Sequence, residues 1–160
     1  MPTQTIEDLI ATMPTFAGLP AEQLATVAGC GRTCGFEAGA EIAREGDPAD
    51  TFYALRSGRV ALEVVAPGQR LTIGTLGPGT VVGWSWLFPP HRWSFDARAL
   101  EPVRAIEFDG ACLRGKCEAD KALGYELMRR FAAIILERLQ GTRVQLLDVY
   151  GRADGGEAGP

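Results

Sequence analysis

The spacing of apolar residues changes twice along the chain and divides it into three regions. In the first region, the apolar residues of segment 5–13 recur at helical intervals until Pro14 interrupts them. Segment 19–29 has the same periodicity, with a proline near its start and a glycine at its end. The sequence therefore predicts two short helices, the second of them within a helical part at residues 14–33.

The second region, residues 34–110, consists of short apolar runs that glycine, proline or aspartate interrupts about every eight to twelve residues. The interruptions fall at 45–50, 57–59, 66–69 and 77–80, and each supplies residues suited to the backbone angles of a turn. Runs of this length and spacing are typical of a small β-roll or barrel. We expect a mainly β fold of the β-roll or jelly-roll type with flanking helices.

The third region is predicted to be a long helix at residues 121–149, along which two apolar strips run. The first strip advances alternately by four and three residues, as in a coiled-coil seam, through Met128, Ala132, Ile135, Leu139, Thr142, Leu146 and Val149. The second strip consists of Leu127, Phe131 and Ile134. One strip can cover the β-roll while the other meets the same helix of a second copy, so we expect a homodimer through residues 121–149. The alternative is an amphipathic helix that packs only on its own domain.

Length and composition indicate one globular domain, which we place at residues 1–150 of the 160. Gly151 is expected to end the long helix, and the polar, glycine-rich residues 151–160 are expected to form a disordered tail. No apolar run reaches the roughly 18 residues of a spanning helix, and the first residues lack the pattern of a secretory signal. We therefore expect no membrane association and a cytoplasmic location.

The charge balance bears on the class of ligand. The chain has 16 basic and 20 acidic residues, which gives a net charge of −4. This charge would repel a polyanion unless the basic residues gathered on one face, so direct DNA binding is not expected.

The turns of the second region resemble those of the cyclic nucleotide-binding domain, in the family of the catabolite activator protein and the regulatory subunits of cyclic-nucleotide-dependent kinases. The resemblance begins with the run FEAGAEIAREGDPADTFYALRSGRVAL and covers roughly residues 14–149. The matching positions are Phe36, Gly39, Ile42, Gly46, Asp47, Asp50, Tyr53, Gly58, Val60, Gly79 and Gly83. The resemblance implies a regulatory β-roll that binds a cyclic nucleotide or another small-molecule effector.

In this family, a phosphate-binding cassette has a Gly-Glu pair and, further on, an arginine before a Ser/Thr-Ala step. The resemblance places Gly83 at the glycine position, Trp84 at the glutamate position and Trp93 at the arginine position. Arg92 comes one place early, and Ser94 is retained. Because the glutamate holds the ribose and the arginine holds the cyclic phosphate, these departures weaken the expectation that ordinary cyclic AMP or cyclic GMP binds.

The candidate ligand-binding residues follow from this comparison: Gly83, Trp84, Ser85, Arg92, Trp93, Ser94, Thr142 and Arg143. Thr142 stands where the activator protein has an adenine-contacting threonine, although it could equally set the register of the seam. The aromatic segment VVGWSWLFPPHRWSF, residues 81–95, has three interpretations. It can fill the interior of the roll, form a pocket rebuilt for a flatter or more apolar ligand, or dock another protein.

Catalytic and metal chemistry find little support in the sequence. The run GWSWL lacks the second glycine of an esterase nucleophile elbow, and His91 is the only histidine, too few for a triad or a jelly-roll metal centre. The run GPGTVVG has the wrong spacing for a dinucleotide loop. We expect no enzymatic activity and no bound metal.

The four cysteines form two close pairs in the sequence, Cys30 with Cys34 and Cys112 with Cys117. We expect small buried thiols at the ends of elements. The alternative is a metal or redox switch, because the family fold lays the first strand of the roll beside the last and could bring the pairs together.

These observations predict a non-catalytic, ligand-sensing regulatory module with a degenerate cassette. The family's transcription factors carry a winged helix-turn-helix after the long helix, and the sequence given contains none, so signalling through the dimer or a protein partner is expected. The alternatives are a ligand-free adaptor for protein interaction, or the cysteine-based switch.

Overall fold

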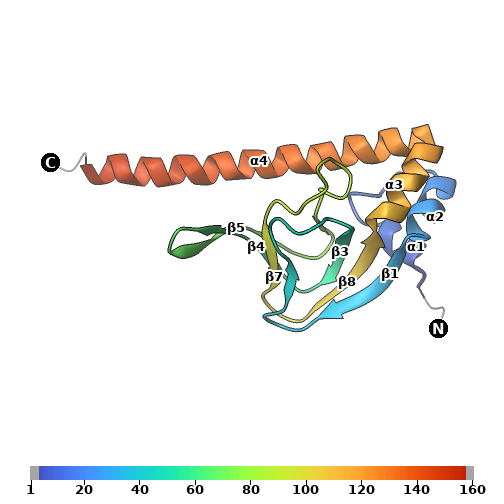
Figure 1. Ribbon diagram of the computed structural model, residues 1–160, viewed down its shortest axis with the longest axis horizontal. Coiled ribbons are helices and arrows are strands. Elements are labelled where there is room, and N and C mark those ends of the chain that lie inside the picture. The colour runs from blue at the N-terminus through green and yellow to red at the C-terminus, as the bar shows by residue number, and fades with distance from the viewer. Residues whose placement is uncertain (1–3, 158–160) are drawn as a thin grey trace.

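Two four-stranded antiparallel sheets face one another and form a β-roll (Figure 1). The computed structural model describes the backbone of residues 4–157 and the side chains of residues 4–141. The first sheet has the order β1-β8-β3-β6, with bounds Gly31–Phe36, Val103–Asp109, Thr51–Ser57 and Val81–Val82. The second has the order β2-β7-β4-β5, with bounds Glu41–Ala43, Asp96–Ala99, Val60–Ala66 and Gln69–Leu76. The predicted mainly β fold with flanking helices is confirmed.

The two N-terminal helices are α1 (Ile6–Ala11) and α2 (Ala21–Ala28). A capping box begins α1: the Asp8 amide donates to the Thr5 hydroxyl and the Thr5 amide donates to the Asp8 carboxylate, each at 3.1 Å. The two helices pack on one another. The N-terminal helical part therefore begins with α1, and the predicted start at residue 14 is too late.

The C-terminal helices are α3 (Gly110–Ala119), which the sequence analysis missed, and α4 (Lys121–Glu157). Two glycines weaken the local helix propensity of α3, but the Asp109 carboxylate caps it by accepting from the Cys112 amide at 3.0 Å, and Leu113 is fully buried. Tertiary packing thus overrides propensity.

The end of α4 also differs from the prediction. The helix continues through Glu157 and does not end at Gly151, because an interior glycine weakens a helix by about 1 kcal/mol without breaking its backbone hydrogen bonds. The predicted disordered tail at 151–160 is therefore helical as far as Glu157, and its last three residues lie outside the described part.

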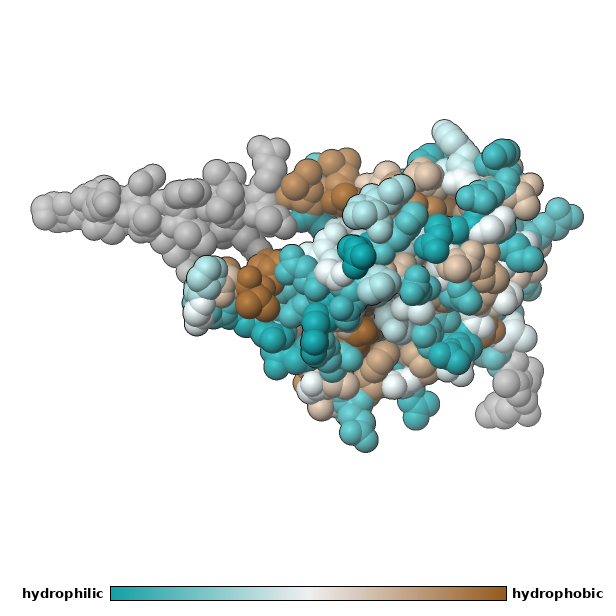
Figure 2. Space-filling model, in the orientation of Figure 1, coloured by the Kyte–Doolittle hydropathy of each residue, from teal (hydrophilic) through white to brown (hydrophobic). Residues whose placement is uncertain are grey.

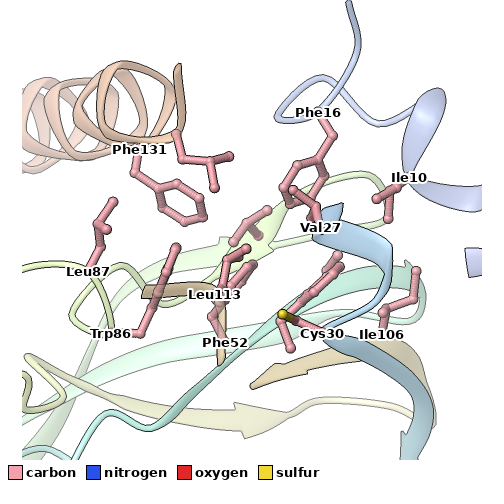
Figure 3. Packing of buried hydrophobic residues seen from close by; sticks show 14 of the residues in the cluster. Ile10, Phe16, Val27, Cys30, Phe52, Trp86, Leu87, Ile106, Leu113 and Phe131 are labelled. Carbon is pink, nitrogen blue, oxygen red and sulfur yellow. The ribbon is translucent and has the colours of Figure 1, made fainter. Parts of the chain in front are cut away.

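The first sheet is covered on both faces, which explains the unbroken apolar runs in its strands. Along β3, Phe52 and Ala54 join the core beneath the helices, whereas Tyr53 and Leu55 face the interior of the roll. Phe52 lies at the centre of the helix-side core (Figure 3). Its ring stacks on Trp86 and on Phe108, each with centroids 4.7 Å apart, and meets the edge of Phe131 at 5.3 Å.

Helix α4 runs along the roll and continues past it (Figure 1). Of its two apolar strips, the second packs on the domain as predicted, since Leu127 and Phe131 are fully buried. The first strip is exposed at Met128 (44%) and Leu139 (56%). Figure 2 shows apolar residues on the surface of the helix beside its grey part. The rest of this strip, from Thr142 onward, lies outside the described side chains.

Across the described residues, no helix combines the length and the apolar character that crossing a bilayer would demand.

We predict that Phe52→Ala lowers the free energy of unfolding by about 3–5 kcal/mol, because it leaves a cavity among three aromatic rings. Val65→Ala is the control, since Val65 is 62% exposed on β4 and its truncation should cost no more than about 0.5 kcal/mol. Urea unfolding at matched protein concentration measures both. Equal effects of the two substitutions would contradict the central position of Phe52.

Candidate functional site

The cassette segment, residues 83–95, begins where β6 ends. Gly83 has a φ of +101°, a conformation that side-chain-bearing residues rarely adopt, and it turns the chain out of the sheet. Backbone hydrogen bonds anchor the other end of the segment to the turn between β2 and β3: Trp93 N donates to Asp47 O at 2.9 Å and Gly46 N donates to Trp93 O at 2.9 Å. The segment is thus fixed at both ends, and its side chains divide between the two cores.

Trp86 belongs to the core beneath the helices. It is fully buried, stacks on Phe52 and meets the edge of Phe131 at 5.2 Å, below helix α4 (Figure 3). Leu87 packs in the same cluster. The interpretation of the aromatic segment as core is therefore confirmed for Trp86.

Trp93 belongs to the interior of the roll and packs against Gly83. Only 6% of Trp93 is exposed, and a Cβ placed on Gly83 would lie 2.6 Å from Cη2 of its ring. The rings of Trp93 and Phe95 meet edge to face at 5.9 Å, and those of Trp84 and Phe95 at 5.1 Å. The residues at the family's arginine and glutamate positions thus form an apolar, aromatic lining beside Gly83.

Arg92 points away from this lining. Its side chain is exposed, and its Nη1 donates to the carbonyl of Gly46 at 2.9 Å, in the turn between β2 and β3. Ser85 is buried and Ser94 is exposed, with their hydroxyl oxygens 3.4 Å apart. The structure therefore brings together all the candidate residues of the segment except the guanidinium of Arg92.

The remaining two candidates, Thr142 and Arg143, lie on the part of α4 whose side chains are not described. Their contribution to the site stays a prediction.

Arg138 of α4 is a site residue that the sequence analysis missed. Its guanidinium carbon lies 5.2 Å from the centre of the Trp84 ring, in cation–π geometry, and its Nη2 donates to the carbonyl of Val81. Burial lowers the pKa of Arg138 to about 10, although the nearby Glu137 opposes this shift. The spacing held a signal, because Arg138 extends the buried strip of Phe131 and Ile134 by one more helical step.

Two buried carboxylates lie on β4 and β7, outside the cassette. Glu63 accepts hydrogen bonds from Arg98 at 3.1 and 2.8 Å, and Asp96 accepts one from the Glu45 amide at 2.7 Å. Arg70 lies 3.4 Å from Asp96. These carboxylates are held in ion pairs and hydrogen bonds, so they fix the outer sheet and do not form an acid–base pair for catalysis.

The prediction that all four cysteines are thiols is wrong for two of them. Cys30 and Cys112 form a disulfide with Cα atoms 6.0 Å apart. The pairing of β1 with β8 explains the partner choice, since Asp109 N donates to Cys30 O at 2.9 Å and sets α3 beside the end of α2. Cys34 and Cys117 are free, and burial raises the pKa of the Cys117 thiol to about 11. Within the described residues, no cluster of three or more metal-ligating side chains occurs.

We predict that Gly83→Ala destabilises the protein by about 1–3 kcal/mol more than Gly39→Ala. Both glycines have positive φ, +101° and +86°, so both substitutions strain the backbone. Only the Cβ at position 83 meets an indole ring, whereas nothing lies within 4 Å of the Cβ at position 39. Urea unfolding measures the difference, and a shift of tryptophan emission should accompany Gly83→Ala alone. Equal costs would show that Trp93 does not pack on Gly83.

The chain is similar to several known proteins. The family model of the cyclic nucleotide-binding domain matches residues 34–120, from within β1 to the residue after α3. A Mycobacterium tuberculosis protein, the CRP-like cAMP-activated global transcriptional regulator, is 26% identical over 145 residues, which are 90% of this chain and 63% of that protein. The chain thus spans less than two thirds of that relative. Glutaminase 2 of Bradyrhizobium diazoefficiens is 30% identical over 84% of this chain but only 21% of its own length.

Solved structures agree with the family match. A chain from Geobacter metallireducens GS-15, named as a cyclic nucleotide-binding protein, has a TM-score of 0.77 and 34% identity, and the match covers 86% of this chain and 99% of that one. The catabolite activator protein of Thermus thermophilus has the same fold, with a TM-score of 0.67 and 24% identity over 86% of this chain and 63% of that chain. The family model covers more than half of the chain, and the observed β-roll agrees with the solved structures: the chain belongs to the cyclic nucleotide-binding domain family.

Proposed function

We propose that the chain is a non-catalytic regulatory module whose cassette takes an effector other than an ordinary 3′,5′-cyclic nucleotide. The packing of Trp93 on Gly83 carries this proposal, because an indole occupies the space beside the glycine where the family's cassette would receive a phosphate. Arg92, the only arginine or lysine of segment 83–95, faces the turn between β2 and β3.

The energetic argument concerns charge. A phosphate held without its guanidinium lacks a charge-assisted hydrogen bond that contributes about 1.5–3 kcal/mol, which corresponds to a ten- to hundredfold loss of affinity. Displacing the buried Trp93 ring would add a further cost, because its apolar surface would return to water. A flat or apolar ligand that stacks on Trp84 avoids both costs.

Trp84 is the residue through which ligand binding at the cassette would affect helix α4. This ring belongs to the cassette segment and lies under the guanidinium of Arg138, a residue of α4. A ligand that moved Trp84 would have to change the contact with Arg138, so the segment and the helix are expected to switch between two arrangements together. The proposal therefore assigns ligand contact to the candidate residues named above and signal transfer to α4.

Dimerisation is the proposed means of transmission. Tyr125, Met128, Leu136 and Leu139 are between 44% and 65% exposed on α4, which leaves an apolar face for the same helix of a second copy. A different protein partner on this face is the alternative, and it corresponds to an adaptor function.

We predict that the native protein shows no saturable heat of binding with 3′,5′-cyclic AMP at micromolar concentrations in titration calorimetry. The double variant W84E/W93R restores the family's carboxylate and guanidinium and should bind cyclic AMP about tenfold or more tightly than W84E/W93M. The second variant is the control, since it opens similar space without the charge. Micromolar binding by the native protein would contradict the proposal whether or not the variants fold.

Thermal-shift screening of the native protein separates the sensor from the adaptor. A shift with one plain nucleotide or aromatic metabolite, abolished by Trp84→Ala, supports the sensor. No shift with any compound, together with a protein partner that co-purifies from the native host and binds the α4 face, supports the adaptor.

The disulfide favours a second candidate function, a redox switch. Cys30 and Cys112 tie the end of α2 to the first turn of α3, and α3 leads directly into α4. A cellular dithiol could reduce this bond, which would take up two electrons and two protons and yield two thiols while the dithiol became a disulfide. The release would loosen the helix that positions α4.

For this candidate we predict that reduction lowers the stability of the purified protein by about 2–5 kcal/mol, because the bond closes a long loop. Thermal unfolding with and without a reductant measures the change, and alkylation of the denatured chain counts the thiols. Cys117→Ser is the control, since Cys117 is free and its loss should leave the response to reductant unchanged. Four alkylated cysteines without any reductant would exclude the bond and the switch.

A further inference from the structure

A hollow of about 470 Å³ lies between α1 and the end of β3, apart from the cassette segment. Its apolar side is formed by Leu9 and Met13; Leu55 also lines the hollow, although its side chain is buried in the interior of the roll. Its polar side is formed by Arg56, Ser57 and Arg104, all exposed. A hollow of this volume is in the range of sites for small molecules.

A β-bulge brings the two arginines together. In the ladder between β3 and β8, Leu55 pairs with Ala105 and the next pair is Ser57 with Arg104, so Arg56 is the extra residue. Two residues of β3 therefore oppose the single residue Arg104. Like charges at one ladder position destabilise a sheet, and the bulge places both guanidiniums at the rim of the same hollow.

Among the side chains that the structure describes, no acidic group pairs with these two arginines. The residues that line the hollow include neither aspartate nor glutamate. Among arginines with described side chains, Arg56 and Arg104 form no ion pair and no side-chain hydrogen bond, whereas each of the others forms at least one. Even the neighbouring exposed Arg59 is paired, with Glu101 at 3.6 Å. The sequence thus supplies counter-charges across the surface and omits them at this hollow.

We propose that this hollow is a second effector site, which binds a small phosphate monoester with an apolar body. A phosphate dianion can neutralise two guanidinium forks at once and accept several hydrogen bonds from them, whereas a monocarboxylate would leave one charge without a partner. The Ser57 hydroxyl adds a donor on the rim, and the side chains of Leu9 and Met13 accommodate the apolar body.

The site is distinct from the cassette but adjoins the chain that leads to it. Leu55 N donates to Thr80 O at 2.9 Å and Gly79 N donates to Leu55 O at 2.8 Å, which fixes the turn before β6 beside the hollow. None of the lining residues belongs to segment 83–95. The two proposals can therefore fail independently.

Phenyl phosphate is the probe, titrated into the full-length protein at a pH above the second phosphate pKa of about 6, with backbone and arginine Nε–H signals followed by NMR. We expect saturable shifts at Arg56, Ser57 and Gly79, and an affinity about tenfold or more lower in R56Q/R104Q. Arg59→Gln is the matched control, an exposed and nearby arginine that already has a carboxylate partner.

Four results would overturn the proposal: no saturable shift, an equal loss of affinity in Arg59→Gln, the same shifts with phenol, or shifts confined to segment 83–95. The first two would mean that the arginines form no site or only a diffuse positive field, and the third would mean that the phosphate is not recognised. The fourth would place the ligand in the cassette. Because Arg56 and Arg104 are exposed, their substitution should leave the fold intact.

Discussion

The stacking of Phe52 between Trp86 and Phe108 is the contact on which the arrangement of the domain depends. Phe52 belongs to β3, Phe108 to β8 and Trp86 to the cassette segment, and the edge of Phe131 adds α4 to the same cluster. One buried group of rings thus joins the sheet, the segment expected to contact ligand and the helix expected to carry the signal. Because interiors of this kind are close-packed, a change in one ring displaces the others.

This cluster also explains why the cassette segment divides in two. Trp86 is held by the helix-side core, while Trp93 and Phe95 fill the interior of the roll. Trp84 contacts both clusters and lies under Arg138, so it is the ring whose position can differ without dismantling either core. The aromatic residues that stabilise the domain therefore include those at the proposed ligand site.

Buried and exposed charged groups differ in whether they need a partner of opposite charge. On the outer sheet, Glu63 and Asp96 are buried and held by Arg98 and Arg70, an arrangement that fixes β4, β5 and β7 relative to one another. Buried carboxylates need such partners, because an uncompensated charge is costly to remove from water. Exposed guanidiniums have no such need, which is why Arg56 and Arg104 can remain without counter-charges at the edge of a hollow.

Local patterns determined much of this protein. The periodicity and the proline and glycine signals predicted α1 and α2, the interrupted apolar runs predicted the strands, and the glycine turns identified the family. The buried strip of α4 was also readable, since Leu127 and Phe131 follow helical spacing. Such signals work because they arise from backbone conformation and burial over a few neighbouring residues.

Contacts between distant segments decided the rest. The sequence pairs each cysteine with its neighbour, but the pairing of β1 with β8 joins Cys30 to Cys112. Helix α3 forms against its own propensity because the core buries Leu113, and the direction of Arg92 depends on the carbonyl of Gly46 in another turn. The sequence specifies which side chains are present. Only the folded chain determines which bonding partner each of them meets, because folding brings some distant groups together and separates others.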